Sequence, residues 1–120
     1  MSTIASIIVL VIGLIHIYIW IFEMFRWETR GPKVFSGFTA EFFKDTKALA
    51  ANQGLYNAFL GVALVLTYFI SDELWQQRIA LYLSGCVLVA GIYGAITVEK
   101  KILFMQAVPA AIAIGAILFT

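Results

Sequence analysis

Four long apolar segments occupy most of this 120-residue chain, and they constrain its fold more than any other feature. The segments run over residues 4–25, 50–70, 76–97 and 102–120. A helix needs roughly 20 predominantly apolar residues to cross a bilayer core of about 30 Å. With 62% hydrophobic and 12% charged residues, the chain has too little polar surface for an ordinary soluble domain. We therefore expect an all-α integral membrane protein, a single four-helix bundle over residues 1–120 that is surrounded by lipid bilayer.

The positions of the lysines and arginines predict one orientation in the membrane. Of the eight, seven lie in the first and third connections between the apolar segments: Arg26, Arg30, Lys33, Lys44, Lys47, Lys100 and Lys101. The remaining one, Arg78, stands alone at the turn between the second and third segments. Because cytoplasmic loops carry an excess of basic residues, we expect the first and third connections to be cytoplasmic. Four crossings of the plasma (inner) membrane then leave both termini on the external side.

The first connection is long enough to have structure of its own. Gly31-Pro32 is expected to end the first helix, because proline cannot continue the hydrogen-bond pattern of a helix. Thr39 is a candidate N-cap of a further helical turn, with Glu41 placed favourably for the helix dipole. Phenylalanines alternate with charged residues here, so we expect an amphipathic stretch at the cytoplasmic interface over about residues 33–48. The alternative is a mobile lid over a site.

Two ionisable residues lie inside the first apolar segment. His16 and Glu23 are seven residues apart, so they share one face of a helix, and Trp20 lies on that face between them. Ionisable groups within a membrane helix are costly, and most of them point into the protein interior or a wet cavity. This face is therefore a candidate ligand-binding site, with His16 and Glu23 as the candidate acid or base.

Other polar residues fall at a similar depth on the remaining segments. Asn52, Gln53 and Asn57 lie on the second segment, Tyr93 on the third and Gln106 on the fourth. The helical rise places all of them in the cytoplasmic half of the membrane, whereas the external half is nearly all aliphatic. We expect these five residues to complete a pocket with the first segment. The alternative is structural, because polar side chains in membranes also hydrogen-bond between helices and fix their register.

The absence of known motifs narrows the chemistry. The sequence contains no Cys/His metal pattern, phosphate-binding loop or nucleophile elbow, and its single histidine excludes a bis-histidine haem within one chain. We therefore expect no metal and no cofactor. The net charge of +1 gives no reason to expect a nucleic-acid partner. If the protein is an enzyme, the simplest reaction is proton transfer on a lipophilic substrate, with His16 or Glu23 as acid or base.

Small residues spaced four apart predict close helix packing. The patterns are Gly54-x-x-x-Ala58, Asn57-x-x-x-Gly61, Ala90-x-x-x-Gly94 and Gly91-x-x-x-Ala95. Such spacings let two helix backbones approach closely, either within one bundle or between the protomers of a homo-oligomer.

Several stretches of the chain resemble a known family. They are Glu23–Trp27 (EMFRW), Lys47–Asn57 (KALAANQGLYN), Gly85–Ala95 (GCVLVAGIYGA) and Lys101–Ala110 (KILFMQAVPA). Together they resemble an uncharacterised, mainly bacterial family of small four-helix integral membrane proteins, which is classified as a domain of unknown function. The resemblance covers essentially the full chain. It implies a four-helix membrane fold, and it implies no activity, substrate or cofactor.

Three functions from different classes fit these observations. The first is a membrane protein with a cytoplasm-facing polar pocket that binds, or converts, a lipophilic or amphipathic small molecule. The second is a homo-oligomeric proton-coupled transporter or channel in which Glu23 or His16 takes up protons. Against it, Glu23 lies near a helix end and the external half lacks polar residues. The third is a structural or accessory subunit whose polar residues only fix helix register.

Overall fold

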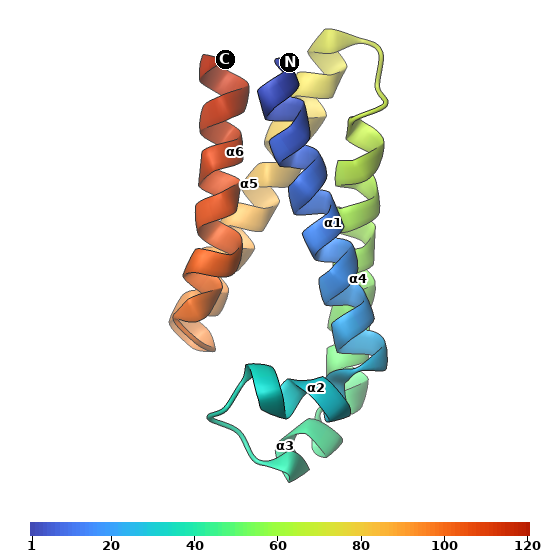
Figure 1. Cartoon of the computed structure of the whole chain (residues 1–120), viewed down its shortest axis with the longest axis vertical. Helices are drawn as coiled ribbons and strands as arrows, with labels where there is room; N and C mark the ends of the chain where they lie inside the picture. The colour runs from blue at the N-terminus through green and yellow to red at the C-terminus, as the bar shows by residue number, and fades with distance from the viewer. The chain divides into compact units, whose positions relative to one another are not determined.

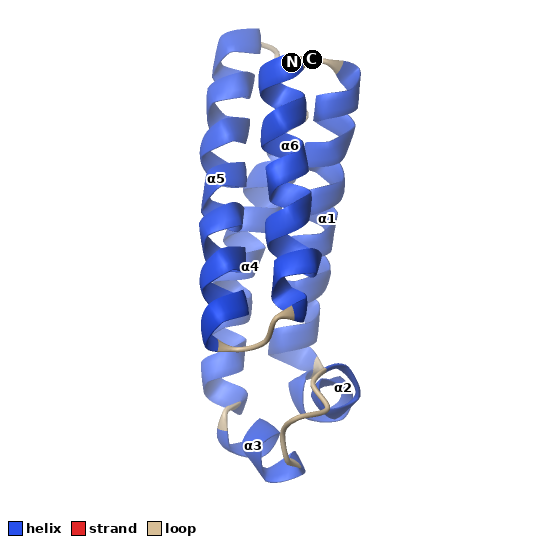
Figure 2. Ribbon diagram, turned by 90° about the vertical axis from the view of Figure 1, so that its left-hand side faces the viewer, coloured by secondary structure: helices blue, strands red, loops and turns tan.

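The computed structural model describes all 120 residues, and its regular structure is entirely helical (Figures 1 and 2). The elements are α1 (Thr3–Phe25), α2 (Trp27–Val34), α3 (Ala40–Asp45), α4 (Lys47–Thr67), α5 (Glu73–Thr97), a π-helical turn η1 (Leu103–Ala107) and α6 (Val108–Phe119). The expected all-α class is therefore confirmed. The four apolar segments correspond to α1, α4, α5 and the continuous pair η1–α6.

Three of the helices are long and apolar enough to cross a membrane: α1, α4 and α5. The fourth apolar helix, Leu103–Phe119, is shorter, with five π-helical and twelve α-helical residues. Its length of about 25 Å falls a little below the bilayer core of about 30 Å. The number and length of these helices are those of a multi-pass membrane protein. That the fourth segment also crosses the membrane stays a prediction.

The chain forms two compact units. The terminal unit comprises residues 1–13 and 63–120, and the central unit comprises residues 14–62. In the terminal unit, α5 packs against η1 and α6 (Figure 2). Its core consists of small and branched apolar side chains: Ala5, Val9, Ile12, Leu64, Ala80, Val87, Ala110, Ala113 and Ile117. The two chain ends lie together (Figure 1), where the hydroxyls of Ser2 and Thr120 are 2.6 Å apart.

A glycine determines how closely α5 approaches η1. A Cβ atom added at Gly91 would lie 2.6 Å from the backbone nitrogen of Ala107. The two backbones are therefore in contact because Gly91 has no side chain, as the small-residue spacing predicts. The π-helical turn lies immediately before Val108-Pro109, and the Val108 N–H bonds to the Leu103 carbonyl five residues back. Pro109 has no N–H to donate, so the ordinary helical pattern cannot continue through it and a wider turn takes its place.

The first helix of the central unit ends earlier than the Gly31-Pro32 signal suggests. α1 stops at Phe25, Arg26 leaves helical geometry with φ −127° and ψ 12°, and α2 carries Pro32 within it. The expectation that Gly31-Pro32 ends the first helix is therefore wrong, whereas α1 ends at residue 25, where the first apolar segment ends. The residue after the break, Trp27, contacts Thr46 and Phe43, which lie later in the chain.

Aromatic rings pack together below the end of α1. The ring of Trp27 lies 5.7 Å from that of Phe22 and 5.1 Å from that of Phe43, and Phe35 lies 6.4 Å from Phe22. Such ring pairs add about 0.5–1.5 kcal/mol each beyond the area that they bury. Gly31 makes room for this cluster, since a Cβ atom there would lie 2.5 Å from the Phe43 ring.

Helix α3 begins where the sequence indicates. The Thr39 hydroxyl accepts a hydrogen bond of 3.2 Å from the Phe42 N–H, and Glu41 lies in the first turn. The predicted N-cap is therefore confirmed. It satisfies one of the backbone donors that a helix start leaves unpaired.

Replacing Gly91 with alanine tests the close contact in the terminal unit. We expect Gly91→Ala to lower the free energy of unfolding by about 1–3 kcal/mol, because its Cβ meets backbone atoms that cannot move aside. Gly85 on the same helix has no atom within 4 Å of its added Cβ, so Gly85→Ala is the matched control. It should be neutral or stabilising by up to about 1 kcal/mol. Equal shifts of the two melting temperatures in detergent would contradict the contact.

Candidate functional site

Glu23 and Asn57 meet where α1 and α4 approach each other. The approach depends on Gly54, where an added Cβ would lie 3.1 Å from Glu23 Cβ and 3.2 Å from the carbonyl oxygen of Trp20. Asn57 follows Gly54 by three residues, so its side chain lies on nearly the same face of α4. Its Nδ2 donates a hydrogen bond of 2.5 Å to Glu23 Oε1. Two residues of the predicted site, one from each helix, are thus in direct contact.

The Glu23–Asn57 contact satisfies a nearly buried carboxyl group. Glu23 is 9% exposed, and burying such a group without a partner would cost several kcal/mol. Asn57 Nδ2 also donates to the backbone carbonyl of Gln53 at 3.3 Å. One carboxamide nitrogen therefore links the carboxyl of α1 to the backbone of α4. This arrangement holds the two helices in register.

The other predicted residues of the first helix are buried in different ways. His16 is 1% exposed and is among the largest fully buried side chains. Trp20 is half-buried, and its indole N–H points along its own helix to Met24 Sδ at 3.4 Å. The Trp20 indole N–H therefore bonds within α1 and does not donate to the Glu23 carboxyl.

The remaining predicted residues are more exposed. Asn52 and Gln53 are exposed on α4, and Gln53 contributes its backbone carbonyl to Asn57. Tyr93 is 68% exposed on α5, and Gln106 is half-buried in η1. Both belong to the terminal unit. The central unit alone therefore brings together Glu23, Asn57 and the Gln53 backbone.

A half-open cavity of about 380 Å³ lies along the end of α1 and the start of α2 in the central unit. It is lined by Tyr18, Ile21, Phe22, Arg26 and Arg30. Its apolar residues come from the end of α1, and its two arginines come from the break at Arg26 and from α2. Sequence reasoning assigned these arginines to topology alone and missed the cavity. The available signal was the spacing of Tyr18, Phe22, Arg26 and Arg30, which are four residues apart.

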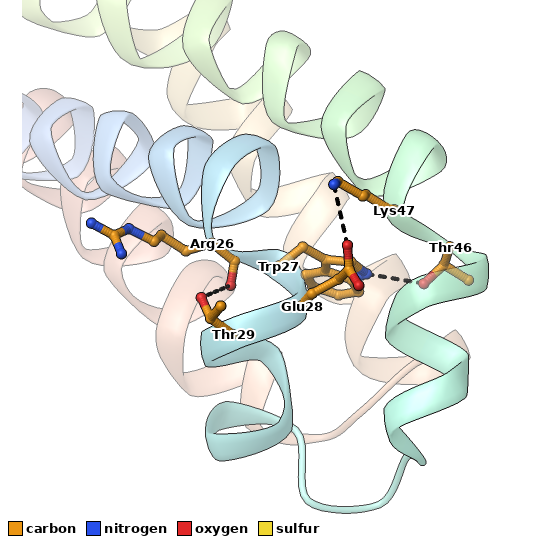
Figure 3. Close-up of polar contacts among 6 residues, drawn as sticks. All are labelled: Arg26, Trp27, Glu28, Thr29, Thr46 and Lys47. Atoms are coloured by element: carbon orange, nitrogen blue, oxygen red, sulfur yellow. Dashed lines mark hydrogen bonds and ion pairs between the residues drawn. The ribbon is translucent and has the colours of Figure 1, made fainter.

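Two contacts hold α2 against the start of α4 (Figure 3). Trp27 Nε1 donates to the Thr46 hydroxyl at 2.9 Å, and Lys47 Nζ lies 3.2 Å from Glu28 Oε1. Figure 3 shows the Arg26 side chain extending away from Thr46 and Lys47. The glutamate beside the break thus pairs with Lys47 and leaves the Arg26 guanidinium without a carboxylate.

Replacing Asn57 with leucine tests the polar contact. We expect Asn57→Leu to lower the free energy of unfolding by about 1–3 kcal/mol, because the Glu23 carboxyl stays buried after losing its donor. Asn52→Leu, the same substitution at an exposed position of α4, should change stability by less than about 0.5 kcal/mol. Unfolding in mixed detergent micelles measures both. A stability loss shared equally by the two variants would argue against the Glu23–Asn57 contact.

Comparison with known proteins identifies the family. Residues 10–118 match the family described as "Protein of unknown function (DUF1304)". The chain is also 29% identical over 108 residues to the uncharacterized protein YpaA of Lactococcus lactis subsp. lactis (strain IL1403), covering 88% of this chain and 89% of that protein. No solved structure matches the chain. The resemblance seen in the sequence is confirmed, and the chain belongs to the DUF1304 family of proteins of unknown function.

Proposed function

We propose that this protein is a plasma-membrane protein that binds an amphipathic small molecule in the cavity between the end of α1 and α2. The observation that carries the proposal is the cavity itself. Its volume of about 380 Å³ falls within the range typical of small-molecule sites. Tyr18, Ile21 and Phe22 supply apolar surface, and Arg26 and Arg30 supply charge at the other end. A ligand with one apolar and one polar end matches this lining.

The proposed orientation places the charged end of the cavity at the cytoplasmic interface. Seven of the eight basic residues lie in the two connections assigned to the cytoplasm. The proximity of Ser2 and Thr120 supports placing both termini on one side, which the proposal takes as external. In this orientation Arg26, at the end of α1, lies at the cytoplasmic side, where a charged head group can reach water while an apolar tail stays within the bilayer.

The lining supports binding and gives no support to conversion. His16 and Glu23 are the candidate acid and base, and neither lines the cavity. The Glu23 carboxyl instead accepts the Asn57 hydrogen bond. A second candidate function, a structural or accessory subunit, is favoured by that same bond, because it fixes helix register without any ligand.

Filling the cavity tests the binding proposal. Ile21 is 43% exposed, so Ile21→Trp adds a ring to the cavity wall without disturbing the core. Native mass spectrometry of protein released from its own membrane should show a bound small molecule in the wild type and its loss in Ile21→Trp. Ile7→Trp is the matched control on α1, at a position 48% exposed and outside the cavity. A wild type that carries no bound molecule would favour the structural candidate.

Cysteine labelling tests the proposed orientation. Ser36 and Ser71 are both exposed, and they lie in the α2–α3 and α4–α5 connections. In a Cys86→Ser background, a membrane-impermeant thiol reagent should label Ser71→Cys in intact cells. Ser36→Cys should react only after the membrane is permeabilised. The reversed pattern would overturn the orientation while leaving the cavity proposal intact.

A further inference from the structure

The charged end of the cavity carries two positive charges that no carboxylate neutralises. Arg26 and Arg30 are both exposed, and neither forms a salt bridge. The acidic residue closest to them in sequence, Glu28, is already paired with Lys47 at 3.2 Å. Because Arg30 N–H bonds to the Arg26 carbonyl at 2.8 Å, the two residues are one helical turn apart. Both residues line the same cavity.

The lining separates charge from apolar surface along the cavity. Tyr18 precedes Arg26 by eight residues, which corresponds to about 12 Å of helix. Tyr18 and Ile21 are exposed, so the apolar end presents free ring and branched aliphatic surface. An acyl chain can lie on this surface while an anionic group lies between the two guanidiniums. Guanidinium groups bind phosphate through paired hydrogen bonds, which the ammonium group of lysine cannot form in the same geometry.

We propose that the ligand of this cavity is an anionic phospholipid, with its phosphate bound by Arg26 and Arg30 and an acyl chain lying along Tyr18 and Ile21. This inference rests on the proposed function and specifies its ligand class. The alternative is that both arginines serve only the orientation of the protein in the membrane. In that case any two basic residues of the same connection would be equivalent to them.

Lys33 and Lys44 provide the control for that alternative. Both are exposed, belong to the same connection and lie outside the cavity lining. The test compares the double variant Arg26→Gln/Arg30→Gln with Lys33→Gln/Lys44→Gln, since each removes two positive charges. The full-length protein, in a phosphate-free maltoside detergent, is mixed with equal amounts of phosphatidylglycerol and phosphatidylcholine of identical acyl chains. Native mass spectrometry then counts the lipid that each protein retains.

The wild type and the lysine variant should retain one phosphatidylglycerol at least about tenfold more than phosphatidylcholine. The arginine variant should lose this preference. Equal losses in the two double variants would show a general charge effect and overturn the inference. Melting temperatures check that the variants are folded. If the double variant is unfolded, the single variant Arg30→Gln takes its place, because Arg30 is exposed on α2.

Three further outcomes overturn the inference in distinguishable ways. Equal retention of the two lipids, abolished by Ile21→Trp, would overturn the anionic class and leave amphiphile binding intact. If the protein retains neither lipid and does not bind inorganic phosphate, the inference and the proposed function are overturned together. Binding of inorganic phosphate that depends on both arginines, without lipid retention, would replace the phospholipid by a soluble phosphate.

Discussion

The hydrogen bond from the Trp27 indole to the Thr46 hydroxyl is the interaction on which the central unit depends. Thr46 accepts from Trp27 at 2.9 Å and donates to the Phe42 carbonyl at 2.6 Å, so it links α2 to the end of α3. Trp27 can reach Thr46 because the chain leaves helical geometry at Arg26. The same break turns α2 away from the axis of α1 and places Arg30 at the cavity that Phe22 also lines. One turn thus creates both the aromatic cluster and the cavity.

Two sets of polar groups in the central unit have different environments. Glu23 and Asn57 are bonded to each other where Gly54 lets α1 and α4 approach, and little of the carboxyl is exposed. Arg26 and Arg30 are exposed and form no salt bridge. In a membrane, a satisfied polar pair stabilises helix association by roughly 1 kcal/mol. The exposed arginines beside apolar surface form no such pair, so they can bind an anionic ligand. This contrast is why the proposed ligand site lies at the arginines and not at the carboxyl.

The sequence predicts the helices well because they are determined by residues that are close together in the chain. Apolar composition and length determine α1, α4 and α5, and the Thr39 cap follows from residues that are near neighbours. The close approach at Gly91 also follows from a local spacing of small residues. The local Gly31-Pro32 signal is misleading, because α2 continues through it, and the chain leaves helical geometry at Arg26, where the apolar segment ends.

The candidate site is predicted less completely for a related reason. The helical rise gives the depth of a residue in the membrane, but it does not say whether the side chain faces another helix or the surface. Glu23 and Asn57 come together, whereas Tyr93 is mostly exposed and Asn52 points to the surface of α4. The cavity arises where two helices diverge, so its lining depends on the angle between α1 and α2. The four-residue spacing of Tyr18, Phe22, Arg26 and Arg30 indicates which face lines the cavity, but it does not give that angle.

The most direct measurement is the ³¹P–¹⁵N dipolar coupling between a bound lipid phosphate and the arginine side chains. The protein contains three arginines, Arg26, Arg30 and Arg78, and Arg78 lies over the Trp75 ring outside the cavity. Protein labelled with ¹⁵N-arginine is frozen in phosphate-free detergent with one equivalent of phosphatidylglycerol. We expect phosphorus dephasing of the Arg26 and Arg30 guanidinium signals and none of Arg78. Equal dephasing of all three, or of none, would contradict it.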